Sequence, residues 1–153
     1  MTEVWITRTR RVAASRDEVW AALTAFDRIS AWAPDVTHSS FTTEATEGVG
    51  MARRVQVGRL ALIETVTTWD PPSTLAYRID GLPPVVAGVT NRWDLALDPV
   101  GTHVSLTSIV TPGRGRRLGA KAVGRVLGKA SDGMLDGLIA HLGRAAPTSQ
   151  DHS

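Results

Sequence analysis

The chain has 153 residues, 42% of them hydrophobic, and a formal net charge of +2. This length is typical of one domain with a real core, and the absence of cysteine excludes disulfides, thiolate metal sites and cysteine nucleophiles. No apolar run is long enough to span a membrane and the N-terminal residues lack the apolar stretch of a signal peptide, so we expect a cytoplasmic protein.

The first part of the chain predicts one strand and two helices. Residues 3–12 are rich in β-formers, and we expect a peripheral strand there because arginines blur the alternation. Ser15 and Glu18 form a capping-box pattern, in which each side chain can bond the backbone N–H of the other residue. The apolar spacing that follows predicts a helix to about Phe26. The stretch DRISAWAP then favours a short second helix that stops before Pro34.

From residue 36 the apolar residues alternate with polar ones, which is typical of strands. Glycine and proline turns separate the segments, and short turns between consecutive strands indicate an antiparallel meander. The expected strands cover residues 36–44, 50–57, 60–69, 74–80, 87–98 and 102–111.

The segment RRVQVGRLALIETV, residues 53–66, predicts a hairpin with a defined register. Gly58 and Arg59 form a Gly-X pair between two alternating runs, which favours a two-residue type II′ turn. Counting back from this turn places Arg53 opposite Glu64. Side chains two residues apart share a face, so this charged pair is expected on an otherwise apolar face of the sheet.

Residues 115–143 predict a long amphipathic helix. Its apolar arc, expected to face the sheet, contains Ala120, Val123, Val126, Leu127, Ala130, Met134 and Leu138. Its opposite side carries Arg114, Arg117, Lys121, Arg125 and Lys129. Five glycines lie within this helix, and because each costs about 1 kcal/mol relative to alanine, they suggest that space or close approach matters more here than helix stability. We expect one domain over residues 1–143 and a disordered tail over 144–153.

This order of elements resembles the START-like, or SRPBCC, helix-grip superfamily, and within it the polyketide cyclase/dehydrase-like branch of small bacterial proteins. The resemblance covers about residues 4–142 and is carried by ASRDEVWAALTAFDRISAWAPDV, by GVGMARRVQV with ETVTTWDPPSTLAYRI, and by GTHVSLTSIVTPG before the long helix. It implies an α+β fold in which a curved seven-stranded antiparallel sheet wraps around the C-terminal helix, with two short helices after the first strand. It also implies a deep apolar cavity between sheet and helix.

Several side chains are candidates for contact with a ligand in such a cavity. The Arg53–Glu64 pair is either a structural ion pair or a polar anchor for a ligand, and the two roles can coexist. Trp32 is either a lid at the cavity mouth or a hydrophobic plug. The other candidates lie on predicted inward faces of the strands or on the apolar arc of the helix: Tyr77, Asn91, Trp93, Leu127, Met134 and Leu138.

The sequence favours binding of a hydrophobic small molecule, such as a lipid, a polyketide or an aromatic. The enzyme alternative is an aromatase/cyclase, in which Arg53 would stabilise an enolate oxygen and Tyr77 would shuttle a proton. The interaction alternative is docking of an anionic membrane surface or RNA at Arg117, Lys121 and Arg125. We expect no metal, because the histidines form no ligand pattern, and no cofactor, because the sequence has no P-loop and no G-x-G-x-x-G motif. The histidines are His38, His103, His141 and His152.

Overall fold

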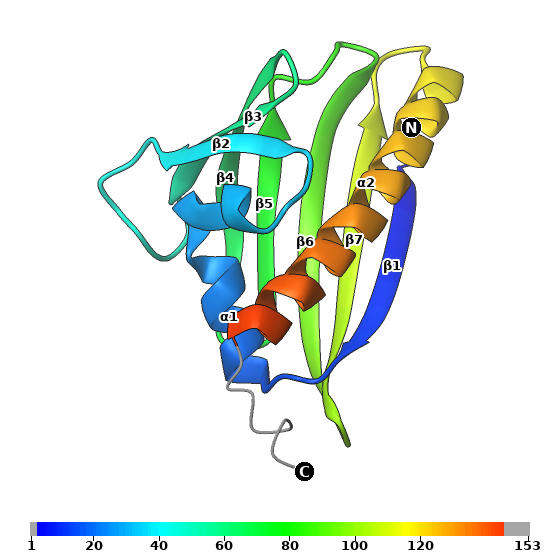
Figure 1. The fold of residues 1–153 in the computed structure, drawn as a ribbon. Coiled ribbons are helices and arrows are strands. Elements are labelled where there is room, and N and C mark those ends of the chain that lie inside the picture. The colour runs from blue at the N-terminus through cyan, green and yellow to red at the C-terminus, as the bar shows by residue number, and fades with distance from the viewer. Residues whose placement is uncertain (1–2, 146–153) are drawn as a thin grey trace.

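Seven antiparallel strands form one curved sheet, and a long helix lies across its inner face (Figure 1). In this computed structural model, which describes residues 3–145, the strand order is β1-β7-β6-β5-β4-β3-β2. Each strand pairs with its neighbour in sequence except β1, which closes against β7. The meander and the helix-grip arrangement expected from the sequence are both confirmed.

The strand positions agree with the sequence expectation to within a few residues, and the largest differences fall in the shorter β2 and β3. The strands are β1 (Val4–Val12), β2 (Val36–Phe41), β3 (Ala52–Val57), β4 (Leu60–Asp70), β5 (Thr74–Asp80), β6 (Val86–Asp98) and β7 (Gly101–Pro112). The helices are α1 (Arg16–Thr24), the 3-10 helix η1 (Phe26–Ala31) and α2 (Arg117–Ala145). Residues 146–153, most of the predicted tail, lie outside the described residues.

Local signals explain the first helix and the central hairpin. At α1 the Ser15 side chain accepts from the Glu18 N–H at 3.1 Å, and the Glu18 carboxylate accepts from the Ser15 N–H at 3.0 Å, which is a capping box. Gly58 has a φ of +59° while Arg59 keeps a negative φ, as a type II′ turn requires. This turn sets the register that places Arg53 opposite Glu64.

Helix α2 packs mainly against β1 and β7, at one side of the sheet. A Cβ at Gly124 would lie 2.9 Å from Ile6 Cδ1, and one at Gly128 would lie 3.1 Å from Ile6 Cγ2. These two glycines therefore leave the helix backbone in close contact with side chains of β1. Because α2 lies over this side, the β3–β5 side of the sheet is less completely covered.

The buried face of α2 is rotated about the helix axis relative to the predicted apolar arc, by about the 100° that separates consecutive residues. The buried line runs through Ala120, Gly124, Gly128, Ser131, Leu135, Leu138 and Leu142. The predicted inward position of Val126 is wrong, since this side chain is 69% exposed. Ala120 and Leu138 of the predicted arc are buried as expected. Leu127, Ala130 and Met134 are half-buried on the flank of α2 that faces β3–β5.

Candidate functional site

A pocket of about 250 Å³ lies between α2 and the β3–β5 side of the sheet. Helix η1 and the segment after it form its third wall. The polar residues in its lining are Asp35, Glu64 and Asn91. Its apolar lining consists of Ile29, Ala33, Val36, Val55, Val57, Leu60, Leu62, Ile79, Leu82, Val126, Leu127, Ala130 and Met134. A largely apolar concavity with a few polar groups is the usual form of a small-molecule site.

Arg53 lies beneath this pocket and is absent from its lining. Its side chain is 2% exposed. Its Nε donates to Glu64 Oε1 at 2.7 Å, and its NH1 donates to the Phe26 carbonyl at 2.9 Å. The guanidinium also lies 3.7 Å from the centre of the Phe26 ring and 4.8 Å from that of Tyr77, where cation–π attraction adds to the ion pair. Arg53 thus ties β3 to β4 and to the start of η1.

Glu64 is the member of this pair that reaches the pocket. Its side chain is 8% exposed, and it lines the cavity from β4. Among the hydrogen bonds of the described residues, only its Oε1 is engaged, by Arg53. A carboxylate has lone pairs on both oxygens, so Oε2 is available to accept a hydrogen bond from a bound molecule.

Tyr77, Asn91 and Ser108 form one cross-strand row from β5 through β6 to β7. The Ser108 hydroxyl donates to Asn91 Oδ1 at 2.7 Å, and Trp93 Nε1 donates to the Tyr77 hydroxyl at 3.2 Å. Burial raises the pKa of Tyr77, and the negative charge of Glu64 raises it further. Tyr77 therefore stays protonated at neutral pH. Asn91 alone in this row lines the pocket.

Trp32 packs into the core behind η1. It is 6% exposed and makes an edge-to-face contact with Trp93, with ring centres 6.1 Å apart. Its Nε1 is the one buried side-chain polar atom of the described residues without a hydrogen-bond partner. Its carbonyl oxygen lies so close to Gly137 that a Cβ there would overlap it. Trp32 is thus buried and absent from the pocket lining, and its role toward a ligand stays a prediction.

The structure brings only some of the candidate residues to one cavity. Glu64, Asn91, Leu127 and Met134 lie together in the pocket lining. Five other candidates are buried in the core and absent from that lining: Trp32, Arg53, Tyr77, Trp93 and Leu138.

Sequence reasoning missed the walls contributed by η1 and the central hairpin. Val55, Val57, Leu60 and Leu62 share a face with Arg53 and Glu64. The same register that paired the two charges could have identified these residues. No such periodicity could have identified Asp35 at the rim, because it follows η1 in an irregular segment.

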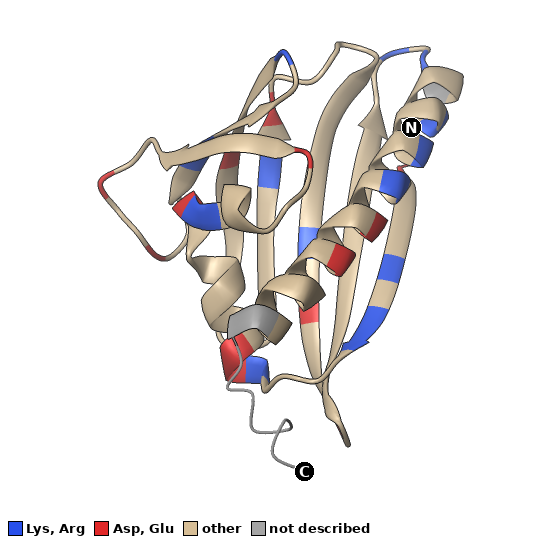
Figure 2. Cartoon of the chain, viewed as in Figure 1, with Lys and Arg blue, Asp and Glu red and all other residues tan. Residues whose placement is uncertain are grey.

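The basic side of α2 faces solvent, away from this pocket. Figure 2 shows Lys and Arg gathered on the N-terminal half of the helix. Lys121 and Arg125 line a separate open groove with Trp5 of β1, which is 63% exposed. The side chain of Arg117 lies outside what the structure describes.

No group of three or more His, Asp or Glu side chains within residues 3–145 is placed to hold a metal ion. In the same range, no helix combines the length and the apolar character needed to cross a membrane.

Comparison with known proteins agrees with this architecture. The profile of the family described as "Polyketide cyclase / dehydrase and lipid transport" matches residues 3–143, and the chain belongs to this family. No curated protein matches the chain in sequence.

Solved structures share the fold at low identity. The Zhui aromatase/cyclase from Streptomyces sp. R1128 is 18% identical with a TM-score of 0.79, over 97% of this chain and 99% of its own. Ara h 8.0201 is 12% identical with a TM-score of 0.78, over 92% and 98%. A protein from Thermobifida fusca is 22% identical with a TM-score of 0.75, over 92% and 93%.

Proposed function

We propose that this protein binds a small, largely apolar molecule in the pocket between α2 and the β3–β5 side of the sheet. The observation that carries the proposal is the lining, which is aliphatic apart from Asp35, Glu64 and Asn91. Membership of a family described by cyclases and lipid transport is in keeping with such a ligand.

The pocket volume limits the size of this molecule. Its 250 Å³ is slightly below the range of about 300–1,000 Å³ typical of small-molecule sites. An apolar cavity of about 150 Å³ accepts benzene. We therefore propose a ligand with the bulk of a two-ring aromatic, or the end of a longer chain that leaves past the exposed Val126.

Native mass spectrometry of freshly purified protein, with an organic extract analysed beside it, tests the proposal. We expect a discrete extra mass that leaves on denaturation and reappears in the extract. A clean apo mass, combined with no binding of added naphthalene, would overturn the proposal.

A cyclase activity is the second candidate, favoured by the family description. The two residues first considered for it, Arg53 and Tyr77, are buried and absent from the pocket lining, whereas Glu64 lines the interior of the pocket. For this reason we favour binding. A recovered ligand that stays chemically unchanged on incubation with the protein supports binding, and its conversion to a cyclised product supports catalysis.

Docking of an anionic surface at Lys121 and Arg125 stays a prediction. Exposed Trp5 beside these residues is the observation that favours it. The double change K121E/R125E should abolish salt-sensitive binding to RNA or anionic vesicles if this side of α2 is used.

A further inference from the structure

We infer that the bound molecule presents a hydrogen-bond donor, a hydroxyl or an amine, to Glu64, and that the pocket rejects carboxylates. This inference rests on the proposed function, because it concerns the same pocket. It reverses the simplest expectation for a ligand site near a buried arginine, which is that the arginine would hold an acidic ligand.

The guanidinium of Arg53 is held by contacts within the protein. One nitrogen is bonded to Glu64, another is bonded to the Phe26 carbonyl, and the flat faces lie against the rings of Phe26 and Tyr77. With 2% of its side chain exposed and no place in the pocket lining, Arg53 is not among the groups that a ligand meets in this pocket, and its positive charge is already balanced by Glu64.

The charged groups that do face the pocket are acidic. Glu64 lies in its interior wall, and Asp35 lies at its solvent-exposed rim. Among the lining residues, all of which belong to the described part of the chain, there is no Lys, Arg or His. A ligand therefore meets a carboxylate at the entrance and, inside the pocket, a second carboxylate whose charge is balanced by Arg53.

Physical chemistry makes this arrangement selective. A carboxylate moved into an apolar pocket loses its hydration, and here it would find no free counter-charge, because the charge of Arg53 is already balanced by Glu64. A hydroxyl or amine loses less hydration, and it can donate to Glu64 Oε2 in a charge-assisted hydrogen bond, which is stronger than a neutral one. The Asn91 side chain is engaged within the protein, by Ser108 and by Tyr77.

Three probes with the same two-ring skeleton test this inference on the full chain: naphthalene, 2-naphthol and 2-naphthoate. Their dissociation constants at pH 7 can be measured by ligand-observed NMR or equilibrium dialysis. We expect 2-naphthol to bind about tenfold more tightly than naphthalene, because a hydrogen bond to a charged group contributes at least this much. We expect 2-naphthoate to bind more weakly than naphthalene.

The outcomes separate this inference from the proposed function. If 2-naphthoate binds as tightly as 2-naphthol or more tightly, the inference is wrong although the pocket binds ligands. If naphthalene and 2-naphthol bind equally, the donor to Glu64 is disproved. If none of the three binds, the proposed function fails and the inference fails with it.

A pair of variants assigns the selectivity to Glu64. Glu64→Gln should reduce the ratio between the dissociation constants of 2-naphthoate and 2-naphthol by about tenfold or more. The substitution removes the charge of the side chain and keeps its shape. Glu47→Gln removes a charge from an exposed loop and should leave the ratio of these two dissociation constants unchanged. If Glu64→Gln does not fold, the three-probe comparison on the unaltered chain still decides the question.

Discussion

Arg53 is the residue whose contacts most directly determine local structure in the central sheet. Its hydrogen bonds to Glu64 and to the Phe26 carbonyl connect β3, β4 and η1 in a region that water does not reach. Removing one partner of a buried pair leaves the other charge without compensation. The pair is therefore expected to be a requirement for the fold whatever the ligand is.

Arg53→Ala should lower the free energy of unfolding by about 3–5 kcal/mol, measured by urea denaturation. Arg78→Ala is the matched control, since Arg78 pairs with Asp80 on the surface with 51% and 55% of the two side chains exposed. The control should lose no more than about 1 kcal/mol. Equal losses in the two variants would contradict the structural role of Arg53.

Two glycines one turn apart in α2 should respond to alanine in opposite ways. A Cβ at Gly137 would overlap the Trp32 carbonyl oxygen, whereas a Cβ at Gly133 would meet only Pro34 Cγ at an ordinary 3.5 Å. Gly133→Ala should stabilise the protein by up to about 1 kcal/mol, the helix-propensity gain. Gly137→Ala should destabilise it, because backbone must shift. Thermal unfolding measures both changes, and stabilisation by both would show that α2 does not approach Trp32 this closely.

The sequence predicted the pairing of Arg53 with Glu64 but not the direction in which each group points. Register follows from the chemistry of the turn at Gly58 and from the two-residue period of a strand, and both can be counted along the chain. The orientation of the guanidinium depends on the Phe26 carbonyl and ring, which another segment supplies. That contact exists only after η1 packs on the sheet.

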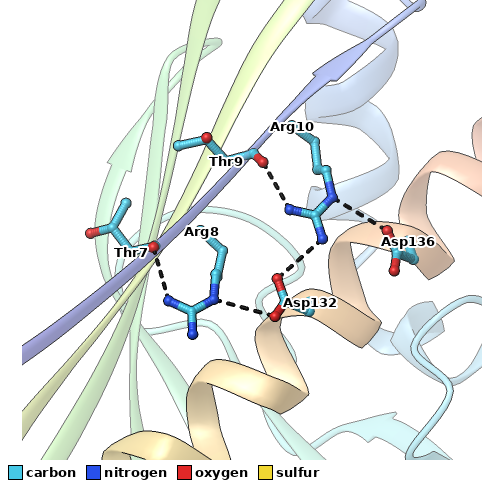
Figure 3. A network of polar contacts seen from close by, with 6 residues as sticks. All are labelled: Thr7, Arg8, Thr9, Arg10, Asp132 and Asp136. Carbon is cyan, nitrogen blue, oxygen red and sulfur yellow. Dashed lines mark hydrogen bonds and ion pairs between the residues drawn. The ribbon is translucent and has the colours of Figure 1, made fainter.

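At the scale of elements, a charged network joins β1 to α2 (Figure 3). Asp132 accepts from Arg8 at 3.3 Å and from Arg10 at 3.1 Å, and Arg10 also pairs with Asp136. Arg8 and Arg10 bond their neighbouring carbonyls as well, at Thr7 and Thr9. Together with the close approach at Gly124 and Gly128, this network fixes where α2 crosses β1.

The network should make stability depend on pH in the acid range. The hydrogen bond from Arg10 lowers the pKa of Asp132 below its usual value, and Arg8 adds to this effect. A carboxyl group with a lowered pKa in the folded state stabilises the fold above its unfolded pKa of about 4, and this contribution is lost as the pH falls through the folded value. In Asp132→Asn, the free energy of unfolding should therefore decrease less steeply below about pH 4 than it does in the unaltered protein.

Urea denaturation of Asp132→Asn between pH 7 and pH 2 measures this effect, with Glu47→Gln in an exposed loop as the control. In the control, the free energy of unfolding should fall with decreasing pH as steeply as it does in the unaltered protein. An Asp132→Asn curve parallel to that of the unaltered protein would show that the network does not couple protonation to folding.

The orientation of α2 was the least predictable property of an element. Helical periodicity weighs large apolar residues most heavily, so it placed Val126 and Leu127 on the buried face. The helix instead turns its smallest side towards β1, because Gly124 and Gly128 allow backbone contact there. Residues without side chains contribute little to an apolar pattern, and their packing partner Ile6 lies more than a hundred residues away in the chain.

At the scale of the molecule, the pocket follows from that placement. Because α2 packs on β1 and β7, its Leu127, Ala130 and Met134 face the opposite side of the sheet across the cavity. The number and order of strands could be predicted from turns and alternation. The pocket itself could not, since its volume depends on where the helix lies and how far it is rotated.

Binding of naphthalene to the unaltered chain and to two α2 variants is the most direct test of the central claim, that this pocket is a ligand site. Ala130→Trp fills the pocket, whereas Ala122→Trp makes the same change at an exposed position on the same helix. We predict equal affinity for the unaltered protein and Ala122→Trp, and a loss of at least about tenfold, or about 1.4 kcal/mol, for folded Ala130→Trp. Naphthalene binding that Ala130→Trp leaves unchanged, or no binding to the unaltered protein, would contradict the claim.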